Sequence, residues 1–187
     1  MRRAAFLDRD GVINRSWVVD GKPYPPAGPE DLELYDGVGL AISRMKSKGL
    51  IVIVVTNQPD IARGTTPRRT VDDIHAMLEQ ELEIDDIFVC PHDDNDDCDC
   101  RKPHPGLIWQ AAEKWNIDVG RSFMVGDRWR DMDAGKAAGC TTIFVNRGYA
   151  EKQPTGHHFE TRSLVEASDL IIEMLEIQGH ENWNRKK

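Results

Sequence analysis

The chain has 187 residues, which suffices for one domain with a hydrophobic core, and its 40% hydrophobic and 30% charged residues are typical of a globular protein. Its apolar runs are shorter than the roughly 18 residues of a membrane span, and Asp8 follows the N-terminus too closely for a secretion signal. A net charge of −8 is the wrong sign for a protein held on nucleic acid by its overall field. We therefore expect a single cytoplasmic domain over residues 1–181 with a polar tail over 182–187, no membrane or nucleic-acid partner, and a monomer in preference to an oligomer.

Short β-rich apolar runs alternate with segments of helical period along the chain. In chain order, the expected elements are a strand at 4–7, a helix at 38–45, a strand at 50–55, a helix from about 70 to 82, a strand at 87–89, a helix at 105–115, a strand at 123–125, a helix at 131–138, a strand at 141–145 and a helix at 164–177. The run at 50–55 is apolar on both faces, as in a parallel strand covered by helices on both sides. This order predicts an α/β fold, doubly wound around a mainly parallel sheet.

Two carboxylates, Asp8 and Asp10, lie just after the first expected strand and are followed by Gly11. In open α/β sheets, ligands bind at the carboxyl ends of the strands. Such a pair can hold a hard cation through oxygen ligands, and one carboxylate can act as a nucleophile. Taken alone, the pair is more often a solvated turn.

Three further polar segments fall where other expected strands end or where a helix begins. They are Thr56-Asn57-Gln58, Arg101-Lys102-Pro103 and the run from Gly126 to Asp131, which contains Asp127 and Arg128. Singly, each is explained as a cap, a solvated ion pair or a turn. Together they place a hydroxyl, amides, cations and carboxylates in order at the carboxyl ends of separate strands of one sheet, which points to a single site.

Three cysteines and a histidine gather within eleven residues at Cys90, His92, Cys98 and Cys100. In a reducing compartment such a cluster predicts a metal site in preference to disulfides. Three thiolates and one imidazole make a complete tetrahedral set for Zn²⁺, so we expect a closed, structural site. Burial as four small core residues is opposed by the five aspartates of the same segment, whereas Cys140, far along the chain, is expected in the core.

The series Asp8-x-Asp10, Thr56, Lys102-Pro103 and Gly126-Asp127-x₃-Asp131 resembles the four motifs of the haloacid dehalogenase-like (HAD) phosphatases, whose fold is Rossmann-like. Segments 6–14 and 98–106 are similar, more narrowly, to those of D-glycero-D-manno-heptose 1,7-bisphosphate 7-phosphatases and the related histidinol-phosphatase domains. The resemblance covers nearly the whole chain.

The resemblance implies Mg²⁺-dependent hydrolysis of a phosphomonoester through an aspartyl-phosphate. Asp8 would be the nucleophile and Asp10 the general acid and base. Mg²⁺ would be held by Asp8, Asp127 and the backbone carbonyl of Asp10, with Asp131 orienting Lys102 or a metal-bound water. Thr56 and Lys102 would hold the remaining phosphoryl oxygens.

About 45 residues separate the first motif from the second, and the second from the third, which is too few for a large cap domain. Substrate selection should then fall to three loops at residues 15–24, 59–64 and 90–100. The expected substrate-binding residues are Asn57, Gln58, Arg63, Arg101 and Arg128. The chain departs from its relatives at Pro59-Asp60, at Arg128 and in the short spacing from His92 to Cys98, all of which concern the substrate.

A sugar bisphosphate, heptose 1,7-bisphosphate above all, is the expected substrate because three arginines surround a single phosphoryl pocket. Histidinol phosphate or another small sugar phosphate is the alternative, since the acidic run at 93–99 offers partners for a cationic amine. A non-enzymatic alternative is a catalytically silent phosphosugar-binding protein, but the presence of both Asp8 and Asp10 argues against it.

Overall fold

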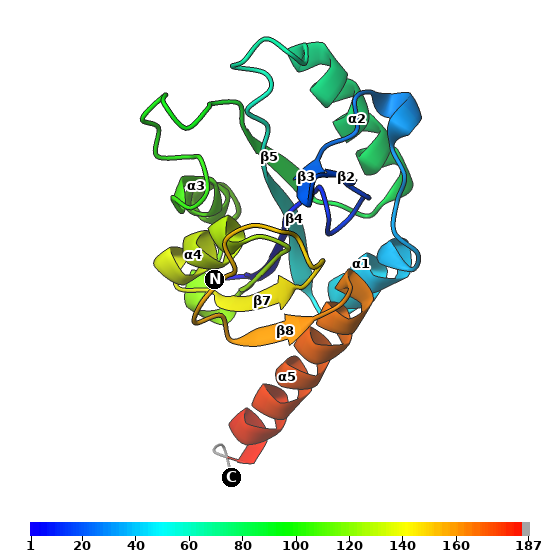
Figure 1. Ribbon diagram of the computed structural model, residues 1–187. Coiled ribbons are helices and arrows are strands. Elements are labelled where there is room, and N and C mark those ends of the chain that lie inside the picture. Colours follow the sequence, from blue (N-terminus) through cyan, green and yellow to red (C-terminus); the bar gives the residue numbers. More distant parts are fainter. Residues whose placement is uncertain (185–187) are drawn as a thin grey trace.

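A six-stranded sheet with strand order β5-β4-β1-β6-β7-β8 forms the centre of the molecule (Figure 1). The computed structural model describes the backbone of residues 1–184 and the side chains of residues 1–177. The sheet strands are β1 (Arg3–Leu7), β4 (Leu50–Asn57), β5 (Asp86–Cys90), β6 (Phe123–Gly126), β7 (Thr141–Val145) and β8 (Phe159–Thr161). Every neighbouring pair in this sheet is parallel, which confirms the predicted doubly wound α/β fold.

Helices cover both faces of the sheet and bury its apolar side chains. The helices are α1 (Val38–Ser47), α2 (Arg68–Glu81), α3 (Gly106–Trp115), α4 (Trp129–Ala138) and α5 (Leu164–Asn184). Successive residues of a strand point to opposite faces. Ala5 and Leu7 of β1 therefore pack in a core with α1, α2 and α5, whereas Ala4 and Phe6 pack in a second core with α3 and α4. Cys140 belongs to this second core and is 2% exposed, as predicted.

A two-stranded hairpin, β2 (Trp17–Val19) with β3 (Lys22–Tyr24), was not expected as a pair of strands. Its turn residues Asp20 and Gly21 have φ of 50° and 74°, the backbone of a two-residue hairpin turn, for which Asp-Gly is a strong sequence signal. Neither strand forms an apolar run in the sequence, because both are short and largely exposed. The hairpin lies within the loop predicted to select the substrate.

Two other elements differ from expectation. The edge strand β8 is only three residues long and mostly exposed, so its apolar signal is weak. Helix α5 continues past residue 177 to Asn184, and residues 185–187 of the expected tail lie outside the described part of the chain. Between residues 1 and 184 no separate cap domain interrupts the sheet, and none of the described helices has the length and apolar character to span a bilayer.

Candidate active site

The three central strands β4, β1 and β6 carry the predicted motifs to one edge of the sheet. Asp8 follows β1, Thr56 lies near the end of β4, and Asp127 follows β6. Since these strands are parallel neighbours, their carboxyl ends meet at the same edge. Lys102 reaches this edge from the segment before α3. The structure therefore brings the four motifs together around one point.

Lys102 lies at the centre of the site and is 2% exposed. Its Nζ donates hydrogen bonds to Asp8 Oδ1 at 2.7 Å and to the Val55 carbonyl at 2.8 Å, and it forms an ion pair with Asp131 Oδ1 at 2.6 Å. These partners use all three donors of the ammonium group. Burial opposes the charge, but Asp131 and Asp8 outweigh it and raise the pKa of Lys102. The lysine is therefore a fixed cation at neutral pH.

Asn57 holds the backbone of Lys102 in place. Its Oδ1 accepts from the Lys102 N–H, and its Nδ2 donates to the Lys102 carbonyl, both at 3.0 Å. The amide was predicted to bind substrate, and in this structure both of its polar atoms are already engaged. Its role toward substrate stays a prediction, while its contact with the Lys102 backbone is direct.

Asp127 is a buried carboxylate whose two oxygens make no hydrogen bond of good geometry among the described residues, although the Tyr149 hydroxyl lies near enough to oppose the rise of its pKa. Burial, followed by the charges of Asp8 and Asp131, raises the pKa of Asp127 well above its usual range. One side-chain atom from each of these aspartates lies within 4.8 Å of the others. Buried polar groups in native proteins are normally satisfied, so this cluster calls for a positive partner. Its all-oxygen donor set fits Mg²⁺.

Gly11 allows the catalytic loop to approach Asp127. A Cβ at this position would lie 1.7 Å from Asp127 Oδ2, and the φ of +87° is in the left-handed region that favours glycine. The Asp8 side chain is also buried, and this burial raises its pKa to about 6, while the charge of Lys102 opposes the shift and the charge of Asp131 adds to it. A divalent cation at the aspartates would favour the charged form of Asp8.

The Asp10 carboxylate is held by donors from three side chains. Asn14 Nδ2 donates to its Oδ1 at 2.9 Å, and Gln58 Nε2 donates to its Oδ2 at 2.8 Å. Arg9 contacts both oxygens, the shorter distance being 2.9 Å. Gln58 also donates to the Thr56 hydroxyl at 2.9 Å, so Gln58 links the first and second motifs.

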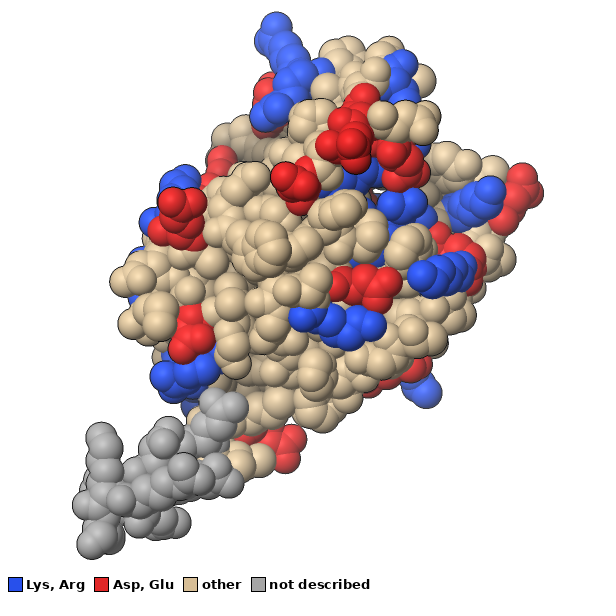
Figure 2. Space-filling view, turned by 90° about the vertical axis from the view of Figure 1, so that its left-hand side faces the viewer, with Lys and Arg blue, Asp and Glu red and all other residues tan. Residues whose placement is uncertain are grey.

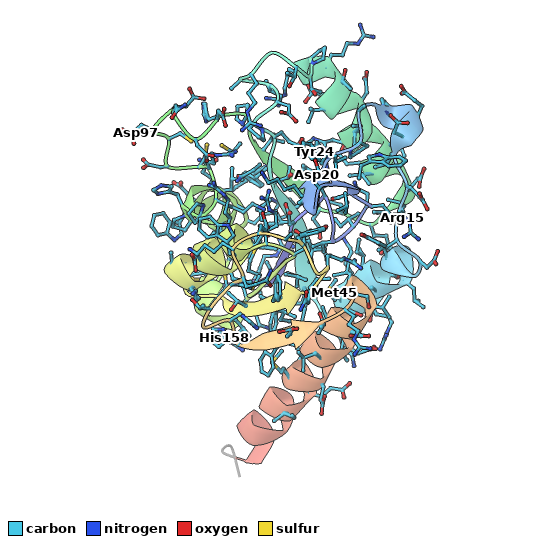
Figure 3. The ribbon with its side chains drawn as sticks, in the orientation of Figure 1. Arg15, Asp20, Tyr24, Met45, Asp97 and His158 are labelled. Atoms are coloured by element: carbon cyan, nitrogen blue, oxygen red, sulfur yellow. The ribbon has the colours of Figure 1, made fainter. Side chains whose placement is uncertain are left out.

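A cavity of about 400 Å³ opens above these groups, and the hairpin β2–β3 forms one of its walls through Lys22 and Tyr24. Figure 3 shows Tyr24 over the middle of the molecule, whereas Asp97 lies at the outer tip of the segment after β5. The volume is at the lower end of the range for small-molecule sites, roughly 300 to 1,000 Å³. A small phosphorylated compound fits this space, and the large loops of a capped enzyme are absent from the described chain.

The three arginines predicted to bind substrate all line the cavity, and each is paired with a carboxylate. Arg63 contacts Asp93 at 2.6 Å, Arg101 contacts Asp94 at 2.8 Å, and Arg128 contacts Glu151. Figure 2 shows Lys and Arg side chains interleaved with Asp and Glu around a hollow in the upper half of the view. Lys22 also lines the cavity, and unlike these three arginines it forms no ion pair with a carboxylate of the described residues.

The predicted zinc ligands converge in the segment of residues 90–100, here called the Cys/His loop. Cys100 Sγ lies 3.1 Å from Cys90 Sγ, 3.6 Å from Cys98 Sγ and 3.2 Å from His92 Nδ1. Cys90 Sγ lies 3.7 Å from Cys98 Sγ. A tetrahedral Zn²⁺ with Zn–S bonds of about 2.3 Å places its sulfurs about 3.8 Å apart, so the distances of 3.6 and 3.7 Å match this geometry, the distance of 3.1 Å is shorter, and all three are far too long for a disulfide. The four side chains therefore fit the group that the sequence predicts.

Comparison with known proteins places the chain in a family. A sequence model of the HAD-hydrolase-like family matches residues 99–173. The chain is 35% identical to a D-glycero-alpha-D-manno-heptose-1,7-bisphosphate 7-phosphatase of Photorhabdus laumondii, over 90% of this chain and 96% of that protein. It is 37% identical to a D-glycero-beta-D-manno-heptose-1,7-bisphosphate 7-phosphatase of Pseudomonas aeruginosa, over 79% and 83% of the two chains. The chain belongs to the HAD-like family of phosphatases.

Solved structures of this family share the fold. A D,D-heptose 1,7-bisphosphate phosphatase from B. bronchiseptica, complexed with magnesium and phosphate, is similar with a TM-score of 0.78 and 30% identity, over 92% of this chain and 99% of that one. The corresponding enzyme from Burkholderia thailandensis has a TM-score of 0.65 and 27% identity, over 91% and 99%. The predicted family and phosphatase class are thus confirmed, while the role of each site residue stays a prediction.

Two residues of the HAD site were not found from the sequence. Arg130 lines the cavity, stacks on Trp129 and contacts Asp94 at 3.0 Å. Its position directly before Asp131 in the fourth motif was the available signal. His75 of α2 is 7% exposed, and its Nε2 lies 2.9 Å from Arg9 Nη1. The two residues are 66 positions apart in the sequence, so no local pattern predicts their contact.

His75 should make the fold sensitive to acid. Burial, followed by the charge of Arg9, lowers the pKa of His75 to about 4 from 6.5. Between these values the unfolded chain binds the proton and the folded chain does not, so stability falls as the pH falls. Relative to His75→Gln, we expect the wild type to lose about 3 kcal/mol of unfolding free energy between pH 7 and pH 4. Urea denaturation of both proteins measures this, and parallel stability curves would contradict it.

Proposed function

We propose that the chain is a Mg²⁺-dependent heptose 1,7-bisphosphate 7-phosphatase that acts through an aspartyl-phosphate on Asp8. The observation that carries the chemistry is the buried Lys102 between Asp8 and Asp131, beside the buried carboxylate of Asp127. This arrangement offers a nucleophile, a fixed cation and a site for a divalent ion at one point. The names of the relatives support the substrate.

In the first step, an Asp8 carboxylate oxygen forms a bond to phosphorus while the bond between phosphorus and the sugar oxygen breaks. Lys102 exchanges one of its three present acceptors for a phosphoryl oxygen, and the Thr56 hydroxyl holds another, as charge shifts toward the leaving group. Asp8, Asp127 and the backbone carbonyl of Asp10 would hold Mg²⁺, whose charge offsets the repulsion between phosphate and carboxylates. Asp131 keeps Lys102 in position through the 2.6 Å ion pair.

Asp10 serves proton transfer in both halves of the reaction. It gives a proton to the departing sugar oxygen and later takes one from the water that attacks the aspartyl-phosphate. Hydrolysis of this intermediate returns Asp8 and releases inorganic phosphate. The donors of Asn14, Gln58 and Arg9 orient the carboxylate for this task.

The charges around the cavity favour a bisphosphate over histidinol phosphate. The acids and the arginines here are paired with each other, since Asp93 and Asp94 bind arginines and the hydrogen bond from Arg63 lowers the pKa of Asp93 to about 2, so Lys22 is the unpaired charge of the described cavity lining that favours an anion. A second phosphate can instead contact Lys22 and exchange with the carboxylates on Arg63 or Arg101. A bidentate contact between a guanidinium and phosphate is the strongest interaction available there.

The substrate assignment predicts a higher kcat/KM for heptose 1,7-bisphosphate than for histidinol phosphate, in assays that include both anomers. Arg101→Ala should lower kcat/KM for the bisphosphate by about 10- to 100-fold, the worth of a charge-assisted contact, and affect p-nitrophenyl phosphate less. Arg69, exposed on α2 and outside the cavity, gives a matched Arg→Ala control. Preference for histidinol phosphate would overturn the assignment.

Zinc in the Cys/His loop would fix the segment that carries Arg101 and Lys102, which follow Cys100 directly. Thiolate ligands need a reducing compartment, and this supports a cytoplasmic location. With four protein ligands and no open position, the ion would be structural.

We expect one zinc per chain in protein purified without chelator, measured by elemental analysis. A Cys98→Ser/Cys100→Ser variant should lose the metal and unfold at a lower temperature, because the binding energy of a structural zinc is folding energy. Cys140→Ser changes a buried cysteine that is not part of the Cys/His cluster, so this variant should keep its zinc. A metal-free wild type, or unchanged zinc in the double variant, would refute the site.

A further inference from the structure

Arg9, the residue between the two catalytic aspartates, is fully buried and holds Asp10 along one edge. Its Nη2 donates to Asp10 Oδ1 at 3.0 Å and to Oδ2 at 2.9 Å, and its Nε contacts Oδ1 at 3.1 Å. A buried guanidinium is costly unless its donors are satisfied. Asp10 satisfies Nε and Nη2, which leaves Nη1 to find another acceptor.

That acceptor is His75, which reaches Arg9 from the buried face of α2. The distance from Arg9 Nη1 to His75 Nε2 is 2.9 Å. Arginine stays charged and can only donate, so Nε2 must carry the lone pair and the imidazole is neutral with its proton on Nδ1. The lowered pKa of His75 agrees with a neutral ring. The three side chains therefore form a directed series, His75 to Arg9 to Asp10.

We propose that His75 is a positioning residue for proton transfer, which acts through Arg9 to fix the carboxylate of Asp10 toward the leaving-group oxygen. The inference rests on the proposed role of Asp10. Without the His75 lone pair, Arg9 Nη1 is a buried donor with no acceptor, and the guanidinium loses the contact that sets its rotation. Asp10 then keeps its hydrogen bonds from Asn14 and Gln58 but loses the fixed orientation of the guanidinium that holds both of its oxygens.

The proposal predicts a loss that depends on the leaving group. A sugar alkoxide needs a proton as it departs, whereas p-nitrophenolate leaves without one. His75→Leu should therefore lower kcat for heptose 1,7-bisphosphate about 10-fold with little change in KM, and lower kcat for p-nitrophenyl phosphate less than about 2-fold. His75→Gln places an amide oxygen that can accept from Arg9 and should restore kcat to within about 3-fold of the wild type.

Two further variants separate positioning from general damage to the fold. Val71→Ala removes a buried side chain one helical turn earlier on α2 and should leave the ratio of the two kcat values unchanged. Asp10→Asn should give the largest change in that ratio. Equal losses on both substrates in His75→Leu, or no loss at all, would overturn the proposal.

A readout that needs no turnover completes the test. In ¹⁵N NMR spectra of the histidine-labelled wild type, His75 should be neutral at pH 7 with the proton on Nδ1, and Arg9→Met should shift its Nε2 resonance. A proton on Nε2 would reject the positioning role even in an active enzyme. A wild type that hydrolyses neither phosphate but shows the Nδ1 proton would reject the proposed function while retaining the His75–Arg9 contact.

Discussion

Asp8→Asn is expected to abolish turnover, lowering kcat by roughly 10⁴- to 10⁶-fold, as loss of a nucleophile does in other covalent mechanisms. Asn keeps the shape of the side chain but cannot form the acyl-phosphate. The same change removes one of three clustered buried carboxylates, and burial, with a smaller contribution from the charge of Asp131, raises the pKa of Asp8 to about 6. The variant should therefore be at least as stable as the wild type, so that lost activity cannot be ascribed to unfolding.

Single-turnover reactions quenched in acid and read by mass spectrometry should show a phosphoryl group on the peptide that contains Asp8, and none in Asp8→Asn. Asp36→Asn changes an exposed carboxylate that does not line the cavity, so it serves as the matched control and should behave as the wild type. Ordinary phosphate release by Asp8→Asn, in a preparation free of other phosphatases, would exclude a covalent role for this residue.

Lys102→Met should damage both catalysis and stability. The lysine neutralises Asp8 and Asp131 at 2.7 and 2.6 Å and is the buried cation that contacts both. Losing the donor to the transferring phosphoryl group is expected to lower kcat about 10²- to 10³-fold. Breaking a buried ion pair by removing one partner costs about 3 to 5 kcal/mol of unfolding free energy, since the carboxylates are left uncompensated.

The stability deficit of Lys102→Met should depend on pH with a defined sign. Without the cation, the pKa of Asp8, which burial already raises, rises further, so the folded state takes up a proton that the unfolded state does not. The deficit relative to the wild type should then shrink as the pH falls from 8 to 5, measured by urea denaturation without added metal. A deficit that is absent, or that grows in acid, would show that Lys102 does not neutralise these groups.

The clustering of Asp8, Thr56 and Asp127 could be predicted from the sequence because these residues lie at the ends of strands whose apolar character is unmistakable. The strands at 4–7, 50–55 and 123–125 are almost wholly buried, so the positions of Asp8, Thr56 and Asp127 at one edge follow from the topology alone. The clustering of Cys90, His92, Cys98 and Cys100 could be predicted for a similar reason, since their chemistry and close spacing need no knowledge of the fold.

The surroundings of the site could not be predicted in this way. The pairing of Arg63 with Asp93 and of Arg128 with Glu151 depends on how exposed loops fold over each other, and any of several nearby acids could have served. The contact between Arg9 and His75 joins residues far apart in the chain, and buried polar pairs have no periodic signal. Specificity and positioning are thus decided by tertiary contacts, whereas the chemistry is carried by local motifs.

The most direct measurement is the site of cleavage in heptose 1,7-bisphosphate, followed by ³¹P NMR with Mg²⁺ present. The proposed function predicts loss of the resonance of the 7-phosphate, appearance of inorganic phosphate and persistence of the anomeric 1-phosphate. Asp8→Asn should leave both resonances unchanged over the same time. Loss of the 1-phosphate first, or no hydrolysis under conditions in which p-nitrophenyl phosphate is cleaved, would contradict the proposed function.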